Sequence, residues 1–356
     1  MTSKKTLTDR VEQIRQRAQE RRAEKPEQSM LDFDAIDTAL ETEGAGVEVE
    51  TANLKRERAK LLPVRHVERD FFLCDMFDYA MKDDGASMEA PIFTLSTRPD
   101  LSVWSWTSKD ESRSVTVTPS IQGRATQFDK DVLIYVVSQM TEALNLERED
   151  AKNRTVRFVV YDYLVSTNKP TGGKEYQRLE AALERLSGTR IKTDIKTGGT
   201  RMKEGFGIIE TWAIVEKSPD DERMIAVEVT FSKWLFNAVQ AHEVLTIHRN
   251  YFRLRKPLER RLYELARKHC GQQAMWTIGL ELLRDKCGAH SHIRAFRSQV
   301  LEIIKADTLP EYRVLYDRAS DQITFYTKDA QKLLAAVVSG KSRLPAAVTR
   351  RCIADN

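Results

Sequence analysis

Residues 244–271 read VLTIHRNYFRLRKPLERRLYELARKHCG, residues 272–288 continue QQAMWTIGLELLRDKCG, and residues 289–313 finish AHSHIRAFRSQVLEIIKADTLPEYR. Their apolar spacing predicts a strand, a basic amphipathic helix, a short strand, a short helix and a second basic helix. Two strand-like runs follow, at residues 312–316 and 323–327, separated by the turn formers of residues 317–321. This order is that of a winged-helix module, which typically places one helix in a groove of DNA.

The same order of elements is predicted earlier in the chain. Helices are expected from residue 128 to about 144, at 161–167 and at 175–187, with a strand at 155–160. A hairpin follows: a strand at 189–195, a basic loop at 196–201 and a returning strand near 207–215. This hairpin stands where a winged helix carries its wing. A strand at 224–230 and a linking helix at 232–240, capped by Ser232, complete the pattern.

We therefore predict an α+β protein with two tandem winged-helix domains, at residues 128–231 and 232–338. A β-rich section at residues 63–127 is expected to pack on the first domain, with strands at 91–96, 103–106 and 114–118. Residues 1–62 are charged, lack long apolar runs and are interpreted as a flexible arm. Residues 339–356 are interpreted as a C-terminal tail.

Composition restricts the class of protein. The chain has 356 residues, 41% of them hydrophobic, which is enough for two folded domains. No apolar run approaches the roughly 18 residues that span a bilayer, and the N-terminus lacks a signal core, so a cytoplasmic protein without membrane contact is expected. Residues 242–313 hold 14 Lys and Arg against 8 Asp and Glu, a net of 14 − 8 = +6. Such a basic C-terminal half suits a polyanionic partner.

In the first domain, the helix at 175–187 is the candidate DNA-reading element. Basic and amide side chains lie off its leucine face, and further basic residues follow the hairpin. The predicted DNA contacts are Lys174, Gln177, Arg178 and Arg185 on or beside the helix, and Lys192, Lys196, Arg201 and Lys203 on the hairpin. Arg and Gln suit base edges, and Lys suits phosphates. Three glutamates on the same helix (Glu175, Glu180, Glu184) favour the alternative, an ordinary solvated helix face.

In the second domain, the helix at residues 291–306 is the stronger candidate, because no carboxylate precedes Glu302 in it. Its N-terminal half is the end that a recognition helix presents to bases. The predicted contacts there are His290, Ser291, His292, Arg294, Arg297 and Ser298. Phosphate contacts beside the groove are predicted for Arg253, Arg255, Lys256 and Arg260 on the preceding segment. The alternative is a solvated basic helix with internal pairs to Glu259 and Glu264.

Several patterns that resemble catalytic motifs are incomplete. The residues SGKS at 339–342 end like a phosphate-binding loop, but Ala335 stands where that motif needs glycine. His290 and His292 lie at a helix start, unlike the strand-borne histidine pair of a relaxase. Cys270 and Cys287 lack the Cys-x-x-Cys spacing of a zinc site. We therefore expect no enzyme activity, no catalytic residues, no bound metal and no cofactor.

Long stretches resemble the replication initiator protein A family of bacterial plasmids. The resemblance covers about residues 63–330. It is carried by DMFDYAMKDDGASMEAPIFTLSTRPD (75–100), KDVLIYVVSQMTEALN (130–145), TGGKEYQRLEAALERLSGTRIKTDIKTGG (171–199), GFGIIETW (205–212) and RNYFRLRKPLERRLYELARKHCGQQ (249–273). Members of this family are in turn similar to iteron-binding initiators built from two winged-helix domains.

The resemblance implies a function that composition alone does not give. It implies binding to repeated double-stranded DNA sites at a plasmid origin, local opening of the duplex, and recruitment of a host initiator, helicase or chaperone. It also implies an equilibrium between monomers and dimers. Two alternatives remain open: a winged-helix repressor, acting on its own gene, and a nicking enzyme of rolling-circle replication.

Overall fold

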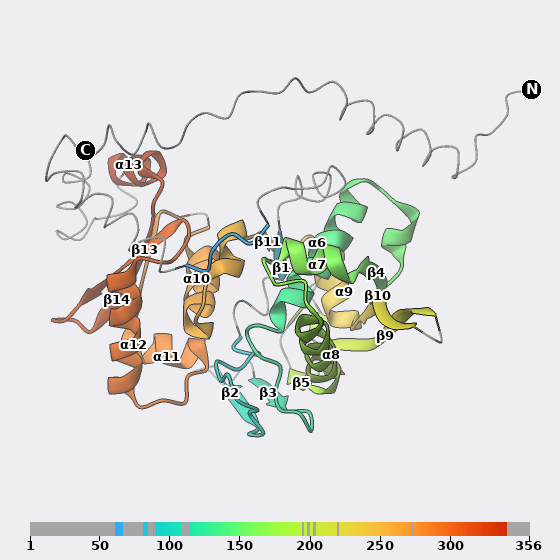
Figure 1. Ribbon diagram of the computed structural model, residues 1–356. Coiled ribbons are helices and arrows are strands. Elements are labelled where there is room, and N and C mark those ends of the chain that lie inside the picture. Colours follow the sequence, from blue (N-terminus) through green and yellow to red (C-terminus); the bar gives the residue numbers. More distant parts are fainter. Residues whose placement is uncertain are drawn as a thin grey trace, which may run out of the picture. The chain divides into compact units, whose positions relative to one another are not determined.

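The computed structural model describes residues 61–66, 81–84, 88, 90–107, 114–193, 196–197, 200–201, 204–218, 221–271 and 273–339. These residues form a mixed helix-and-sheet fold (Figure 1). The predicted arm lies outside the described residues except for Leu61 and Leu62, and the predicted tail except for Ser339.

The first of two similar groups of elements, called here the first module, spans residues 130–231. In chain order it contains α6 (Lys130–Asn145), the 3-10 helix η1 (Glu149–Lys152), β4 (Thr155–Val159), α7 (Val160–Ser166), α8 (Gly173–Gly188), β9 (Ile209–Ser218) and β10 (Asp221–Phe231). Its antiparallel sheet has the order β4-β10-β9. The predicted helices and the strand at 155–160 are confirmed within one or two residues. Helix α9 (Lys233–Gln240) follows, and Ser232 caps it as predicted by accepting a hydrogen bond from the Leu235 amide.

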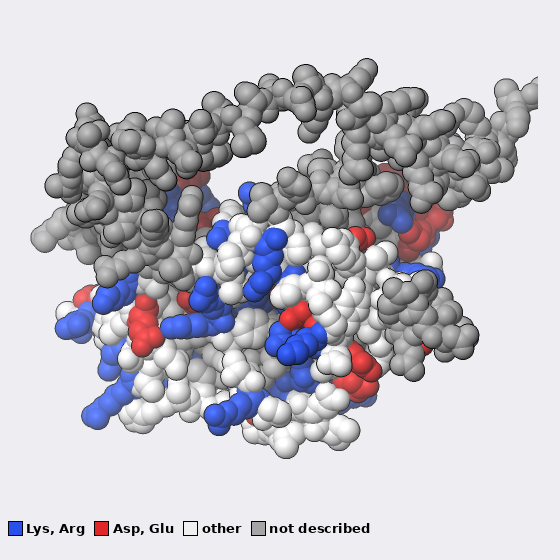
Figure 2. All heavy atoms as spheres, in the orientation of Figure 1, with Lys and Arg blue, Asp and Glu red and all other residues white. Residues whose placement is uncertain are grey.

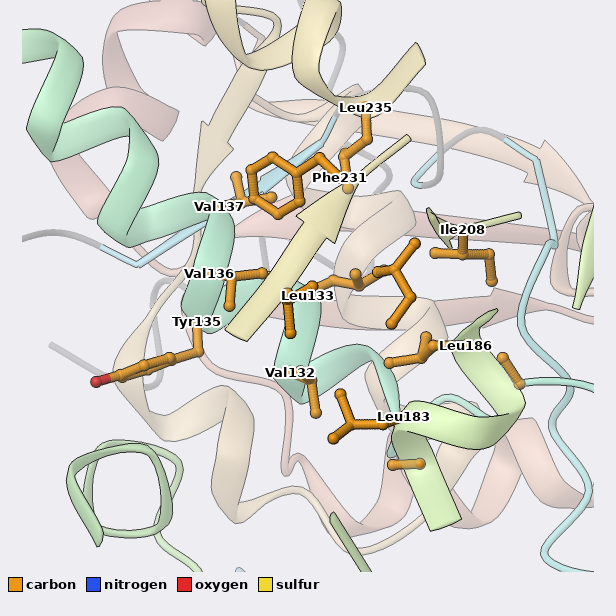
Figure 3. Close-up of a cluster of buried hydrophobic side chains, with 14 of the residues drawn as sticks. Val132, Leu133, Tyr135, Val136, Val137, Leu183, Leu186, Ile208, Phe231 and Leu235 are labelled. Atoms are coloured by element: carbon orange, nitrogen blue, oxygen red, sulfur yellow. The ribbon is translucent and has the colours of Figure 1, made fainter. Parts of the chain in front are cut away.

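The apolar positions that predicted the helices of the first module form its core. Val132, Leu133 and Val136 of α6 are buried with Leu183 and Leu186 of α8 (Figure 3). The last residue of β10 and the start of α9 close the same cluster. Because these side chains recur every three or four positions, one face of each helix is removed from water.

The second module spans residues 257–327. It contains α10 (Pro257–His269), β12 (Met275–Gly279), α11 (Leu280–Cys287), α12 (Ile293–Ala306), β13 (Tyr312–Asp317) and β14 (Gln322–Thr327). Its sheet has the order β12-β14-β13, and β13 and β14 are the predicted hairpin. Helix α11 ends at Gly288, whose φ of +66° lies in the left-handed region that favours glycine. Helix α13 (Ala330–Val338) follows the hairpin.

The two modules share one topology. In each, the early strand (β4 or β12) pairs with the second strand of the hairpin that follows the helix pair (β10 or β14). The hairpin in this place in the first module is therefore β9–β10. The sequence-based prediction placed it at residues 189–215, and that prediction is wrong.

The mispredicted hairpin belongs to a separate sheet. Strands β2 (Trp104–Thr107), β3 (Ser114–Thr118), β5 (Arg190–Thr193) and β8 (Glu204–Gly207) form a four-stranded sheet in that order, and β6 (Lys196–Thr197) pairs with β7 (Thr200–Arg201). The predicted returning strand divides at the buried Ile208, between β8 and β9. A Cβ atom at Gly207 would lie 2.6 Å from the carbonyl oxygen of Ile209, so the chain turns tightly where only glycine fits.

Two segments that precede the first module, residues 82–84 and 91–96, contact later parts of the chain. Strand β1 (Lys82–Asp84) pairs with β11 (Val244–Thr246) across more than 160 residues of sequence. The strand predicted at residues 91–96 does not form. This segment makes one isolated bridge, between Thr94 and Thr126, and its Ile92 and Phe93 are buried in the core. The 3-10 helix η2 (Arg249–Arg253) leads from β11 into α10.

A buried charge network connects α6 with α10. Asp131 accepts hydrogen bonds from Arg260 and from Lys169, the latter at 2.7 Å. Glu264 forms ion pairs with Lys130 at 3.1 Å and Arg261 at 3.3 Å. All of these side chains except Lys169 are almost completely shielded from water. Since an unpaired buried charge is costly, the network fixes the first module against α10.

Candidate nucleic-acid interface

Helix α8 presents the polar face that the sequence predicted. Leu179, Leu183 and Leu186 are buried, while Lys174 and Gln177 are exposed. This orientation leaves Lys174 and Gln177 available for contacts outside the protein.

The two arginines of α8 have internal partners. Arg178 is exposed but donates a hydrogen bond to Glu175. Arg185 donates two hydrogen bonds, from Nε and Nη2, to the two carboxylate oxygens of Asp129, both at 2.7 Å. These hydrogen bonds raise the pKa of the Arg185 guanidinium, although burial opposes the effect. The prediction that Arg185 reads DNA is therefore corrected: its bidentate donor edge is occupied inside the protein.

Asp129, the partner of Arg185, stands at the N-cap position of α6, but its side chain makes no capping bond to the helix. The carboxylate instead joins α8 to the start of α6 through Arg185 and accepts a hydrogen bond from the Thr126 amide at 2.8 Å.

Helix α12 has the more open surface. Phe296, Val300 and Ile303 are buried, as predicted. The candidates on the opposite side are mostly exposed: His290, His292, Arg294 and Ser298 are exposed, and Ser291 is half-buried. The Nδ1 atom of His292 accepts a hydrogen bond from the Arg294 amide at 3.2 Å, so this histidine caps the helix. The remaining exposed donors of α12 are available to a partner.

Arg297 of α12 is held by the hairpin of the same module. Its Nη2 atom donates to both oxygens of Asp321, each at 3.1 Å, and 34% of its side chain stays exposed. The Tyr316 hydroxyl also donates to Asp321, at 2.6 Å. Hydrogen bonds from Tyr316 and Arg297 hold the pKa of the Asp321 carboxyl below its usual range. Asp321 therefore sets the direction of Arg297.

The predicted phosphate contacts around α10 divide into two groups. Arg255 and Lys256 are exposed, and Lys256 pairs with Glu302 of α12 at 3.0 Å. Arg253 is half-buried and donates to the carbonyl oxygen of Leu62 at 2.7 Å. Arg255 and Lys256 thus remain surface candidates, while Arg253 serves chain packing.

The prediction that Arg260 contacts phosphates is wrong, because its side chain is buried. Its side chain is only 3% exposed, pairs with Asp131, and lies over the rings of Phe128 and Tyr251 at 4.6 and 5.1 Å. Burial opposes its charge, but Asp131, Tyr251 and Glu264 together raise the pKa of the guanidinium above the ordinary value. Arg260 cannot contact DNA because α10 is covered on all sides from Leu258 to Ala266.

The basic hairpin is only partly described. Lys192 of β5 is exposed. The backbone of Lys196 and Arg201 lies in the β6–β7 pair, but their side chains lie outside the described residues, as does all of Lys203. On the face seen in Figure 2, Lys and Arg side chains gather over the middle and lower part of the described surface, with fewer Asp and Glu among them.

A pocket beside α8 was not predicted from the sequence. It has a volume of about 490 Å³ and lies between residues 96–99, residues 122–129 and α8. Arg98, Arg124 and Lys169 line it together with the two arginines of α8. No periodic pattern marks Arg98 or Arg124, because both lie in irregular segments that meet α8 only in the folded chain.

The two cysteines considered for zinc lie in the core of the second module. Cys270 and Cys287 are both buried, and burial raises the pKa of each thiol to about 12. Within the described ranges, no three His, Cys, Asp or Glu side chains are grouped so that they could hold a metal ion. Within those same ranges, no helix is both long and apolar enough to cross a bilayer.

The chain is similar in sequence to replication proteins. The chain is 30% identical over 277 residues to a protein of Wigglesworthia glossinidia brevipalpis named as a replication protein, covering 77% of this chain and 98% of that one. Residues 82–314 match the family described as Replication initiator protein A. The chain belongs to this family.

Two solved protein structures are similar to this chain over part of its length. Domains 2 and 3 of RctB share 12% sequence identity with this chain, with a TM-score of 0.47 over 70% of this chain and 99% of that structure. The Pi initiator protein, solved in complex with iteron DNA, shares 16% identity, with a TM-score of 0.39 over 58% of this chain and 92% of that structure.

Proposed function

We propose that this protein initiates plasmid replication by binding repeated DNA sequences at the origin through two tandem winged-helix modules. Membership of the Replication initiator protein A family supports the role. The observation that carries the DNA-binding part is the repeated topology, in which a helix with an exposed polar face, α8 or α12, precedes a hairpin paired to the early strand. Such a helix is the element that reads the major groove in winged-helix proteins.

Helix α12 is the main reading element in this proposal. Its first turns present Arg294 and Ser298, with His290 just before the helix. Arginine suits guanine edges, and the free amides of a helix N-terminus suit a phosphate. Lys256, close enough to pair with Glu302 of α12, would contact a phosphate beside the same groove.

Helix α8 provides a second, less charged contact. Lys174 and Gln177 are its exposed candidates, since Arg178 and Arg185 already have carboxylate partners. Two reading helices cover a longer site than one, so the pair of modules suits a repeat longer than a single half-site. We further propose that binding helps to open the duplex, that host replication proteins are recruited, that monomers and dimers are in equilibrium, and that the protein is not an enzyme.

Footprinting on the DNA of the chain's own replicon tests the binding. We expect protection of several regularly spaced repeats near one origin, and loss of protection when the repeats are scrambled. Uniform protection without preferred sites would contradict sequence-specific binding.

A second assay addresses the absence of enzyme activity. Supercoiled plasmid carrying the origin is incubated with the full-length protein and Mg²⁺ or Mn²⁺. We expect no relaxed circles and no protein covalently attached to DNA. A nicked product that carries the protein on one strand end would overturn the non-enzymatic proposal.

A further inference from the structure

The pocket beside α8 is lined by more cations than carboxylates. Five cationic side chains contribute to it, and so do two acidic ones, Asp129 and Glu175. The cationic residues are Arg98, Arg124, Lys169, Arg178 and Arg185. A concave basic surface of this kind attracts anions, and its depth limits the screening of its charges by water.

Four of the five cations already have carboxylate partners. Arg185 pairs with Asp129, Arg178 with Glu175, Lys169 with Asp131, and Arg124 with Asp100. These pairs hold the side chains that line the pocket in place and neutralise much of its charge. What is left for a ligand is the positive charge of Arg98 and the unused donor atoms of Arg124.

Arg98 and Arg124 are unlike the other three. Arg98 is exposed, and no carboxylate pairs with its guanidinium anywhere in the described part of the chain. Arg124 is 1% exposed, and its Nη2 atom donates to Asp100 at 2.8 Å. The Nε and Nη1 atoms of Arg124 are buried and have no hydrogen-bond partner among the described residues.

Asp100 accepts a hydrogen bond from the Nη2 atom of Arg124 but not from its Nε or Nη1 atoms. Its carboxylate also accepts hydrogen bonds from Thr94 Oγ1 at 2.7 Å and from the Ser102 amide at 3.1 Å. Burial lowers the pKa of the Arg124 guanidinium, and Asp100 opposes that shift. A buried guanidinium with two unused donors is costly, because such groups almost always find an acceptor.

We propose that this pocket binds a phosphate ester, with Arg124 at its base and Arg98 at its mouth. Guanidinium groups match phosphate oxygens in geometry and charge. The volume of about 490 Å³ exceeds the space of a single phosphate group and falls in the range of small-ligand sites, roughly 300–1,000 Å³, so a whole nucleotide unit fits. The phosphate is either one of the DNA backbone beside α8 or that of a free nucleotide. The first source rests on the proposed function, and the second does not.

Calorimetry with the full-length protein and the nucleotide dAMP, in the absence of DNA, is the first test. We expect the wild-type protein to bind at low salt, and Arg98→Ala and Arg124→Met to bind about 10- to 100-fold more weakly, the equivalent of losing one or two charge-assisted hydrogen bonds. Arg157→Met is the matched control, because Arg157 is an exposed arginine of the first module, paired with Glu228 and outside the pocket. Circular dichroism and melting check that Arg124→Met folds; Arg98→Ala keeps the test decisive if it does not.

Binding to an origin duplex at several salt concentrations separates the two sources. If the phosphate is that of the backbone, dAMP competes with DNA and Arg98→Ala reduces the salt slope by about one. If it is that of a free nucleotide, dAMP and DNA bind together and the slope is unchanged. Two results would overturn the proposal. One is equal dAMP binding by the wild type and both variants; the other is no dAMP binding by the wild type together with equal salt slopes of DNA binding. The unused donor atoms of Arg124 would then be explained by a bound structural water. Failure of the proposed function is a different result: wild-type protein that does not prefer the origin duplex.

Discussion

The two modules share a topology but use their arginines differently. In the first module, Arg185 of α8 is tied by two hydrogen bonds to the buried Asp129. In the second module, Arg294 of α12 is exposed, and Arg297 is tied to Asp321, a residue at the surface. A buried carboxylate makes an arginine part of the scaffold, while an exposed position leaves it available to a partner. Similar helices thus differ in function through the partners of their charges.

The junction between α6 and α10 should show the largest effect. Replacing Arg260 by Met leaves Asp131 buried with only Lys169 as a charged partner. We expect a loss of about 3–5 kcal/mol in the free energy of unfolding, measured by urea denaturation. Arg157→Met, which breaks an exposed pair with Glu228, should cost about 0–1 kcal/mol. If Arg260→Met weakened DNA binding without changing stability, Arg260 would be a DNA contact like the exposed candidates Arg255 and Lys256.

Arg185 should behave as a scaffold residue. Arg185→Met removes both hydrogen bonds to Asp129, whose side chain is almost fully buried. We expect the free energy of unfolding to fall by about 1.5–3 kcal/mol, with discrimination between cognate and mismatched duplexes unchanged once the folded fraction is taken into account. Thermal melting and binding titrations with both duplexes measure the two quantities on one preparation. If discrimination fell while stability held, α8 would resemble α12 and the contrast between the modules would disappear.

Arg294 should show the opposite behaviour. Arg294→Ala removes an exposed side chain, so the melting temperature should stay within a degree or two of wild type. Specific binding should weaken by about 1–3 kcal/mol, and discrimination against a mismatched site should decrease. Competition titrations with cognate and mismatched duplexes measure both. Lys305→Ala, an exposed cation near the C-terminal end of α12, is the control. Equal behaviour of the two variants would exclude α12 as the reading helix.

The smallest effect is expected at Asp321. Asp321→Asn releases Arg297 and removes a negative charge, so the salt dependence of DNA binding should steepen by about one phosphate contact. The pKa of Asp321 is lowered in the folded protein, so its stabilising contribution is present above the unfolded value near 3.9 and is lost only as the pH falls through the lower folded value. The contribution of Asp321 to the wild-type salt slope should therefore stay constant between about pH 5 and 8. An Asp321→Asn slope equal to that of wild type would show that Arg297 does not reach DNA.

Much of the fold could be predicted from local sequence patterns. The apolar spacing predicted both helix pairs and the hairpin β13–β14, and the preference of serine for helix starts predicted the cap at Ser232. The wing of the first module was misassigned because residues 205–215 (GFGIIETWAIV) are rich in apolar strand-forming residues, although the chain changes sheets at Ile208. Such a run predicts that a strand forms but does not specify its partner.

The candidate site was predicted less completely. The buried faces of α8 and α12 were predicted correctly from their leucine, isoleucine, valine and phenylalanine positions. Burial of one face of a helix leaves the opposite face toward solvent. Arg260 was misassigned since a basic residue on an amphipathic helix is usually exposed, and α10 is buried all round. Arg98 and Arg124 were missed because the pocket they line with α8 is assembled from segments far apart in sequence.

The sequence by itself determined the order of the helices and strands, the apolar faces that form the two cores, and the family. Tertiary structure alone decided which strands distant in the sequence pair and which charges face solvent. Asp131 and Arg260 stand 129 positions apart, and Arg124 and Asp100 stand 24 apart in irregular segments. The physical reason is range: periodic burial is a property of neighbouring residues, whereas the burial and pairing of a charge depend on every element that packs around it.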